Sequence, residues 1–242
     1  MTKYVLWHWI DPQQVIAAKI AFVVSPDDAV FGLLQSSLHE YWALRRGGKF
    51  GVGGSFSYSS TACFRSFPFP AWTGESVRRV RELGAEISLV RRQLALRESI
   101  GLTEIYNRFH DRNCCDTDIV RLRLLHQRLD EVVAEAYGWS DFDFSREWLS
   151  TTESGSETEE GEGDLGLDGD EEWRYSISDS TREAILARLL ELNAERALEE
   201  KTALTASKQA SEQGKKKPAA ATKSTKTAAP VGQGNLFGVK ER

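Results

Sequence analysis

The sequence predicts an α+β fold, in which a small mixed sheet with one buried helix precedes an α-helical region and a disordered basic tail. Three observations predict it. The first 70 residues mix strand-like and helix-like patterns. Residues 73–150 carry two long apolar stripes at the three- to four-residue spacing of helices. From residue 205 onward the chain is rich in Ala, Lys, Thr and Ser and has little to bury.

Two strands and a buried helix are predicted at the start of the chain. Residues 3–10 alternate bulky β-forming residues, and the short apolar run 19–24 closes on a turn cluster. A buried helix is expected from about 28 to 45, ending at Gly47-Gly48, where glycine can adopt the left-handed capping conformation. Its apolar residues recur at helical spacing: Phe31, Leu34, Leu38, Trp42 and Leu44.

A glycine- and serine-rich stretch, residues 47–62, comes after this helix. We expect a short strand at 61–67, because Pro68 and Pro70 then interrupt any regular ladder.

Three helices are predicted in the middle of the chain. The first carries most of its arginines off its apolar stripe, the second begins with Thr103 as its N-cap and covers 105–110, and the third begins near Asp116. We expect the first and third to pack as an antiparallel pair. The first stripe consists of Val77, Val80, Leu83, Ile87, Val90 and Leu94, and the third of Ile119, Leu122, Leu125, Leu129, Val132, Val133 and Ala136.

The net charge of −5 hides three regions of different charge. Residues 1–150 hold 18 Lys/Arg and 18 Asp/Glu, residues 151–200 hold 4 and 16, and residues 201–242 hold 9 and 2. Residues 151–172 are therefore predicted to be an acidic disordered insert. A last helix, opened by a capping box at Ser180–Glu183, is predicted to run to about 202 and to pack on the helical domain. The predicted divisions are 1–72, 73–150, 151–172, 173–204 and 205–242.

The cysteine pattern and the apolar runs exclude several classes of protein. Cys63, Cys114 and Cys115 cannot pair completely and lack metal-ligand spacing, so we expect reduced thiols in a cytoplasmic protein. No apolar run reaches the roughly 20 residues of a membrane helix, and no signal pattern is visible. Because the chain opens on a strand-like run, we expect it to begin inside a domain and to expose apolar residues within 1–30.

No catalytic, cofactor-binding or metal-binding residue is predicted. The sequence has no glycine-rich strand–turn–helix loop for a nucleotide or adenosyl cofactor, no P-loop and no Gly-x-Ser-x-Gly. The loop at 11–14, Asp-Pro-Gln-Gln, differs from an Asp/Asn-Pro-Pro-aromatic catalytic loop. It lacks the second proline, and it lacks the aromatic residue that stacks on a flipped base. The four histidines are scattered, and we interpret each as a surface or core-edge residue: His8, His39, His110 and His126.

The stretch 45–65 holds the candidate nucleic-acid contacts. Its glycines permit close backbone approach, and its basic and hydroxyl side chains suit phosphate and base-edge contacts. The alternative is a solvated loop between a helix and a strand. The candidate residues are Arg45, Arg46, Lys49, Tyr58, Ser59, Ser60, Thr61 and Arg65.

Several ordered segments resemble fused type II restriction–methyltransferases of the MmeI-like kind. The series 31–39, Trp42 and Tyr58–Pro70 resembles their target-recognition domain, which commonly closes on a "Y-S-x-T-x-x-F-x-x-F-P-F-P" stretch. Residues 102–107, 125–133, 136–139 and 188–196 continue the resemblance in the same order. It covers roughly residues 1–200.

The resemblance implies a parent enzyme that methylates adenine at N6 with S-adenosylmethionine, while its recognition domain reads double-stranded DNA. The cofactor and catalytic motifs that lie upstream in that family are missing from this sequence. The resemblance thus implies DNA positioning, with the basic segment and the arginine-bearing helix after it lying along a duplex. It also implies a catalytic half encoded upstream and little activity for this chain alone.

A second resemblance lies in the tail. Residues 233–237, Gln-Gly-Asn-Leu-Phe, are similar to the short peptide that docks on the bacterial sliding clamp, with Gln233, Leu236 and Phe237 as the contacts. Two alternatives therefore stay open beside the recognition module: a non-enzymatic helical adaptor that binds a partner such as the clamp, and a non-functional remnant of a split gene.

Overall fold

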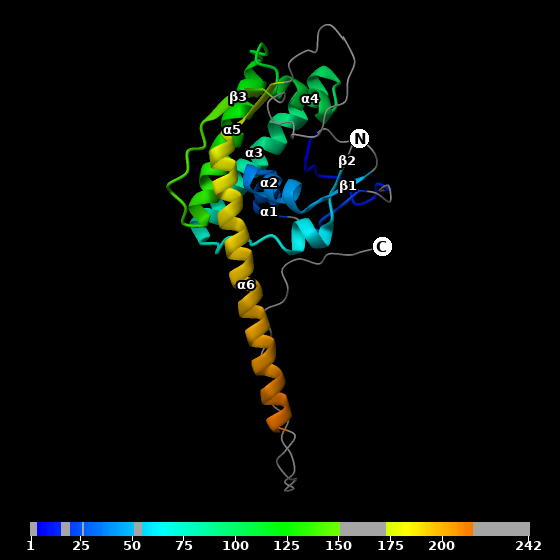
Figure 1. Cartoon of the computed structure of the whole chain (residues 1–242). Coiled ribbons are helices and arrows are strands. Elements are labelled where there is room, and N and C mark those ends of the chain that lie inside the picture. The colour runs from blue at the N-terminus through cyan, green and yellow to red at the C-terminus, as the bar shows by residue number, and fades with distance from the viewer. Residues whose placement is uncertain (1–3, 16–19, 26, 51–54, 151–172, 215–242) are drawn as a thin grey trace, which may run out of the picture.

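The computed structural model describes residues 4–15, 20–25, 27–50, 55–150 and 173–214 (Figure 1). The α+β class is confirmed, because the described chain combines helices with short antiparallel strands. The elements are α1 (Asp28–Gln35), α2 (Ser37–Arg46), β1 (Gly48–Phe50), β2 (Ser55–Ser57), the π-helix η1 (Ser60–Arg65), α3 (Gly74–Glu98), α4 (Leu102–Phe109), α5 (Thr117–Ala136), β3 (Arg146–Ser150), β4 (Trp173–Ile177) and α6 (Asp179–Gly214).

The predicted buried helix is present as two helices that are broken at Ser36. Ser36 has an extended backbone (φ −69°, ψ 152°), and its Oγ accepts a hydrogen bond from the His39 backbone N–H at 3.4 Å. A serine at this position therefore ends α1 and caps α2. Residues 29–39 are all buried, as predicted for this segment. The predicted left-handed cap is wrong, because Gly47 has a φ of −71°.

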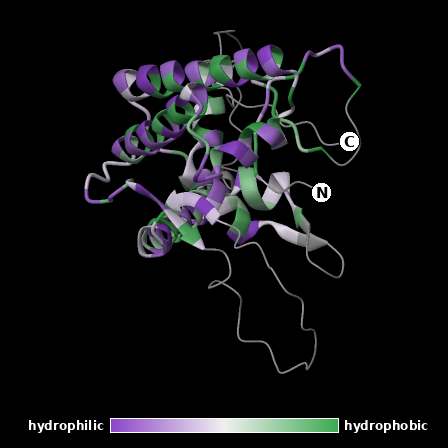
Figure 2. Cartoon of the chain, turned by 90° about the horizontal axis from the view of Figure 1, so that it is seen from above, coloured by the Kyte–Doolittle hydropathy of each residue, from purple (hydrophilic) through white to green (hydrophobic). Residues whose placement is uncertain are grey.

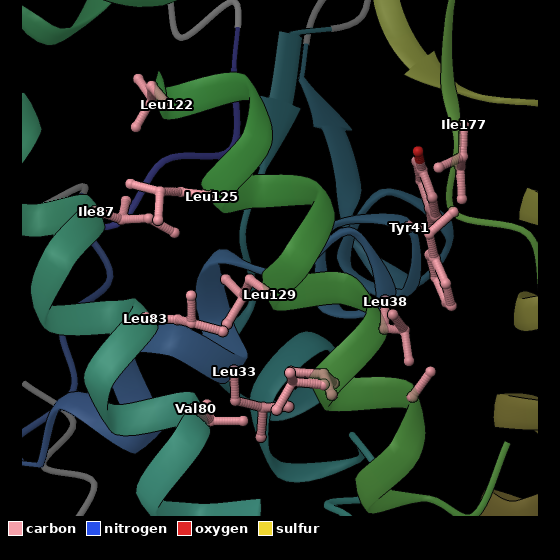
Figure 3. Close-up of a cluster of buried hydrophobic side chains, with 14 of the residues drawn as sticks. Leu33, Leu38, Tyr41, Val80, Leu83, Ile87, Leu122, Leu125, Leu129 and Ile177 are labelled. Atoms are coloured by element: carbon pink, nitrogen blue, oxygen red, sulfur yellow. The ribbon is translucent and has the colours of Figure 1, made fainter. Parts of the chain in front are cut away.

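The antiparallel pairing of α3 and α5 is confirmed. An ion pair between Arg79 and Glu135 joins the start of α3 to the end of α5, and one between Arg97 and Asp118 joins the opposite ends. Figure 2 shows that hydrophilic and hydrophobic residues alternate along the long helices. Their apolar faces meet in the core, which also receives Leu33 of α1 (Figure 3). The core side chains of this pair include Val80, Leu83, Ile87, Leu122, Leu125 and Leu129.

Two glycines let α1 and α3 touch. A Cβ added to Gly84 would lie 2.5 Å from the Asp28 carbonyl oxygen, and one added to Gly32 would lie 2.8 Å from the Val80 carbonyl oxygen. No real Cβ tolerates such distances, so a glycine is required on each side of the crossing. The crossing fixes α1, and with it α2, on the α3–α5 pair.

The predicted strands near the start of the chain are wrong. Residues 4–10 form no strand, because their polar groups are bonded by helical side chains: Arg91 donates to the Trp7 carbonyl, and the Tyr4 hydroxyl donates to Asn107 Oδ1 at 3.0 Å. Of the predicted strand at 19–24, only Val24 forms an isolated bridge in the described residues. The single mixed sheet is therefore replaced by two antiparallel hairpins, β1–β2 and β3–β4.

Two further differences between the sequence predictions and the structure concern strands. The predicted strand at 61–67 is η1, because Ser59 caps a helical turn there. The sequence does not predict β3 and β4, because ladder partners such as Ser150 and Trp173 are separated in sequence by residues 151–172, which lie outside the described residues.

The predicted helix ends are correct in part. Asp116 caps α5, as expected, accepting from the Asp118 N–H at 2.8 Å. α4 is capped by Gly101 and not by Thr103. α6 begins one residue before the predicted capping box, since the Ser178 hydroxyl accepts from the Thr181 N–H at 3.2 Å. It also continues through residues 205–214, which the sequence assigns to the tail. No helix of the described chain is long and apolar enough to cross a membrane.

A buried polar cluster joins three elements around Asp130 of α5. Its carboxylate accepts from the Ser37 backbone N–H at 2.7 Å, from the Ser37 hydroxyl at 2.8 Å and from the Arg146 guanidinium at 2.5 Å. Burial raises the pKa of Asp130, while the neighbouring Arg146 opposes that rise. Each buried charge thus has a partner, and α2, α5 and β3 are held in one arrangement.

Candidate nucleic-acid interface

Tyr58 points into the protein. It is the first residue of the stretch Tyr58–Pro70 that carries the family resemblance, which we call the aromatic motif. Its hydroxyl lies 3.1 Å from His39 Nε2, and its ring meets the Trp7 ring edge-on at 5.1 Å. His39 Nδ1 lies 3.2 Å from the Leu34 carbonyl oxygen, so the proton of the neutral imidazole is on Nδ1. Tyr58 therefore donates to Nε2. Burial lowers the pKa of His39 to about 3 and raises the pKa of Tyr58, which keeps both groups neutral.

Ser59 and Cys63 attach η1 to α2. The Ser59 hydroxyl accepts from the Ala62 N–H at 3.2 Å and so caps η1. Cys63 is fully buried, and its Sγ donates to the Ala43 carbonyl of α2 at 3.7 Å. Burial raises the pKa of the Cys63 thiol, so it remains protonated for this contact. One face of η1 is thereby fixed against the last turns of α2.

The opposite face of η1 presents Thr61 and Arg65 to solvent. Because Cys63 lies against Ala43, η1 packs beside the last turns of α2, and Arg45 and Arg46 in the C-terminal turn of α2 are also exposed. The Arg46 guanidinium lies 5.5 Å from the centre of the Trp42 ring, which orients it. We call the exposed residues Arg45, Arg46, Thr61 and Arg65 the cationic surface.

The backbone of this surface continues into the β1–β2 hairpin. Gly47 links α2 to β1, and a Cβ there would lie 2.8 Å from the Ala43 backbone carbonyl oxygen, so glycine suits this close turn. Lys49 is placed in β1 and pairs with Phe56 across the hairpin. Residues 41–74 contain four Lys/Arg and no Asp or Glu. The sequence carries this signal, and the structure leaves Arg45, Arg46 and Arg65 exposed on two elements that pack against each other.

α6 and the residue that follows α5 bind backbone carbonyls at the end of the motif. Asn193 Nδ2 donates to the Ser66 carbonyl at 2.6 Å, and the Arg196 guanidinium donates to the Phe69 carbonyl at 2.6 Å. The Tyr137 hydroxyl donates to the Pro68 carbonyl at 2.8 Å. The sequence alone did not reveal these roles, although Asn193, Arg196 and Tyr137 all fall in segments that carry the family resemblance. These bonds bring distant segments of the chain together in the fold.

Seven of the eight candidates divide into two sets, and the eighth, Lys49, belongs to β1. Tyr58 and Ser59 have internal hydrogen bonds, and Ser60 is the half-buried first residue of η1. The residues of the cationic surface are free to meet a ligand from solution, and their contact with DNA stays a prediction. The clamp-binding candidates Gln233, Leu236 and Phe237 lie outside the described residues, and so does the acidic insert.

The arginines of α3 do not extend the cationic surface. Arg78 pairs with Glu75 and Glu82, and Arg81 pairs with Asp27 at 3.0 Å. Arg91 is buried and donates to Gln35 and to the Trp7 carbonyl. These pairs cancel most of the positive charge of the helix. The expectation that α3 lies along a duplex stays a prediction.

Comparisons with known proteins match parts of this chain. Residues 1–71 match the family described as "MmeI, target recognition domain", and the match ends between Pro70 and the first residue of α3. The resemblance to MmeI-like enzymes is thus confirmed for this segment. The chain is also 26% identical over 137 residues to "DNA methyltransferase A" of Bacillus subtilis (strain 168). That match covers 56% of this chain and 14% of the relative. No solved structure matches the chain.

Proposed function

We propose that this chain is the DNA-binding, target-recognition part of a site-specific DNA methyltransferase of a restriction–modification system, which methylates adenine at N6. The observation that carries the proposal is that two features fall in the same segment of the chain. The segment that matches a target-recognition domain also provides the cationic surface, with Arg45, Arg46 and Arg65 exposed.

The geometry suits a duplex. Guanidinium groups on α2 and η1 are carried by elements packed on the core, so they can bind phosphates without ordering a loop. The neighbouring β1–β2 hairpin is a two-stranded antiparallel ribbon, an element that the major groove of B-DNA admits. Phosphate contacts by the arginines would position the hairpin and Thr61 for base contacts.

The described residues do not fit the cofactor of the parent enzyme. An adenosyl cofactor needs a strand that turns through glycines into the N-terminus of a helix. Here Gly47 and Gly48 come after the C-terminus of α2, and β2 leads into the six-residue η1 through Tyr58 and Ser59. We therefore derive no step of methyl transfer from this chain and assign transfer from S-adenosylmethionine to a catalytic part elsewhere.

Exposed apolar side chains support a protein partner of that kind. Of the 14 exposed large apolar residues in the described chain, six fall within residues 9–24, as expected from the sequence: Trp9, Ile10, Val15, Ile20, Phe22 and Val24. Such a concentration is typical of an interface. We propose that it packs against the catalytic part. Purified chain is expected to transfer no labelled methyl groups to duplex DNA, and transfer by the chain alone would contradict this division of labour.

Recognition is tested by selection from a pool of random duplexes at several salt concentrations. The expected result is enrichment of one short sequence, together with a log–log salt slope of about −0.9 for each phosphate neutralised. Binding that enriches no sequence would remove target recognition from the proposal. A salt slope near zero would remove DNA binding as well.

A further inference from the structure

Arg91 of α3 is a buried cation whose partners in the described chain are neutral. The residue is 2% exposed. Nη1 donates to Gln35 Oε1 and, at 3.4 Å, to the Tyr106 hydroxyl, and Nη2 donates to the Trp7 carbonyl. The guanidinium carbon lies 5.6 Å from the centre of the Phe31 ring. Among the described residues no carboxylate pairs with Arg91, although a buried charge without a counter-charge is costly.

Two other buried arginines show how this chain satisfies such a group. Arg146 forms an ion pair with Asp130. Arg123 uses backbone oxygens, since all three of its nitrogens donate, to four carbonyl groups in total. Arg91 has neither solution within the described chain. Its charge has no ion pair, and its Nε has no acceptor.

Three buried donors around Arg91 have no acceptor in the part of the chain that the structure describes. They are Arg91 Nε, the Gln35 side-chain nitrogen Nε2 and the Trp7 indole nitrogen Nε1. Gln35 and Trp7 both accept a hydrogen bond from Arg91, so the three residues form one bonded group. Half of the six unpaired buried side-chain atoms of the described residues belong to it. Because buried polar atoms are nearly always bonded, such a group indicates an acceptor that comes from outside the chain.

The acceptor that fits this group is a small anion. A water molecule brings no negative charge, and its own O–H groups need acceptors where the unpaired protein atoms are all donors. A monovalent anion accepts from several donors at once and neutralises the guanidinium, whose weak hydration suits a buried pair. The positive charge also acts on its surroundings. Burial is the larger cause of the lowered pKa of His8, and the charge of Arg91 lowers that pKa further.

We propose that Arg91, Gln35 and Trp7 form a binding site for a monovalent anion of the size of chloride. The site joins α3 to the last residue of α1 and to the segment that precedes α1. The Trp7 ring also meets the Tyr58 ring edge-on at 5.1 Å. A bound anion therefore stabilises the packing against which Tyr58 is placed. This inference is independent of DNA binding, so either can fail without the other.

Bromide, which replaces chloride and scatters anomalously, tests the location of the site. Crystals of the full-length chain are soaked in sodium bromide, and an anomalous difference map is calculated. We expect a peak within hydrogen-bond distance of Arg91 Nε. Peaks at exposed arginines alone would identify an adventitious ion only, and that result, or a map without peaks, overturns the proposal.

Thermal unfolding of the full chain tests the energetics. The midpoint is measured in sodium chloride and in sodium gluconate, an anion too large for a buried site, at equal ionic strength. Each tenfold increase in chloride above its Kd should raise the midpoint by about 3–5 °C, because the anion binds the folded state. Gluconate should not produce this rise.

Two charge-matched variants complete the test. Gln35→Glu places a carboxylate against Arg91, so it should raise the midpoint in gluconate and abolish the dependence on chloride. Gln93→Glu makes the same change in charge at an exposed position of α3 and should keep that dependence. Equal wild-type midpoints in the two salts would overturn the proposal. So would a chloride dependence that persists in Gln35→Glu, because chloride would then act elsewhere on the protein.

Discussion

Asn193 of α6 donates a hydrogen bond from Nδ2 to the backbone carbonyl of Ser66, 127 residues earlier in the chain, at 2.6 Å. Ser66 is the residue that ends η1. The position of η1, which carries Thr61 and Arg65 of the cationic surface, therefore depends on a helix near the other end of the chain. Removing this bond should disturb that surface.

Asn193→Ala should leave the Ser66 carbonyl without its partner. Because the site is part-buried, we expect a loss of about 1–2 kcal/mol in the free energy of unfolding and weaker DNA binding. Urea unfolding and fluorescence anisotropy measure the two effects. Glu195→Ala, at an exposed neighbouring position, is the control and should change neither. Wild-type stability in Asn193→Ala would show that the bond does not hold η1.

Tyr58→Phe separates packing from base reading. The hydroxyl is turned toward His39, so its removal should cost about 1 kcal/mol of stability and leave DNA affinity almost unchanged. Thermal unfolding and duplex binding are measured on the same preparation. A loss of affinity with unchanged stability would mean that the hydroxyl contacts DNA.

The buried His39 should make the folded protein less stable in acid. Burial lowers the pKa of His39 from 6.5 to about 3, so between these pH values the unfolded chain binds a proton there that the folded chain does not. Stability from this group is complete above pH 6.5 and falls by about 1.4 kcal/mol per pH unit below it. Urea unfolding between pH 5 and 7.5 should show a shallower pH dependence in His39→Gln than in wild type. Parallel pH profiles would contradict the assignment.

Gly84→Ala tests the crossing of α1 and α3. The new methyl group would lie 2.5 Å from the Asp28 carbonyl oxygen, so the helices must separate, at a cost of about 1–3 kcal/mol. Gly74→Ala is the matched control in the same helix, because nothing lies within 4 Å of its added Cβ. Equal unfolding midpoints for the two variants would show that the crossing is looser than described.

The helices could be predicted from the sequence because their signals are local. The stripes of α3 and α5 repeat over many turns, and Asp116 stands directly before its helix. The predicted start of α6 was wrong because Ser178, and not the expected Ser180, accepts the hydrogen bond of a first-turn backbone N–H. Ser36 also broke a helix that the apolar spacing alone could not divide.

The strands could not be predicted, because strand pairing depends on distant partners. The β-like residues 4–10 lie against helices, where Arg91 and Asn107 satisfy their polar groups. The true strands β3 and β4 are separated by an acidic segment that hides their pairing. For the candidate site, the sequence indicated a group of cations; Arg45, Arg46 and Arg65 are exposed, and their contact with DNA stays a prediction. The sequence could not show that Tyr58 points inward or that Asn193 and Arg196 hold the motif.

Binding of DNA phosphates by Arg45, Arg46 and Arg65 can be tested with a pair of charge-matched variants. Duplex affinity and its salt slope are compared between R45Q/R46Q/R65Q and R78Q/R81Q/R121Q, a variant with the same change in charge at arginines paired with Glu75, Glu82, Asp27 and Glu86. We predict that the first variant reduces the slope by up to about 2.7 and weakens binding, while the second binds like wild type. Equal losses of affinity in both variants would contradict this role, because binding would then depend on overall charge and not on the cationic surface.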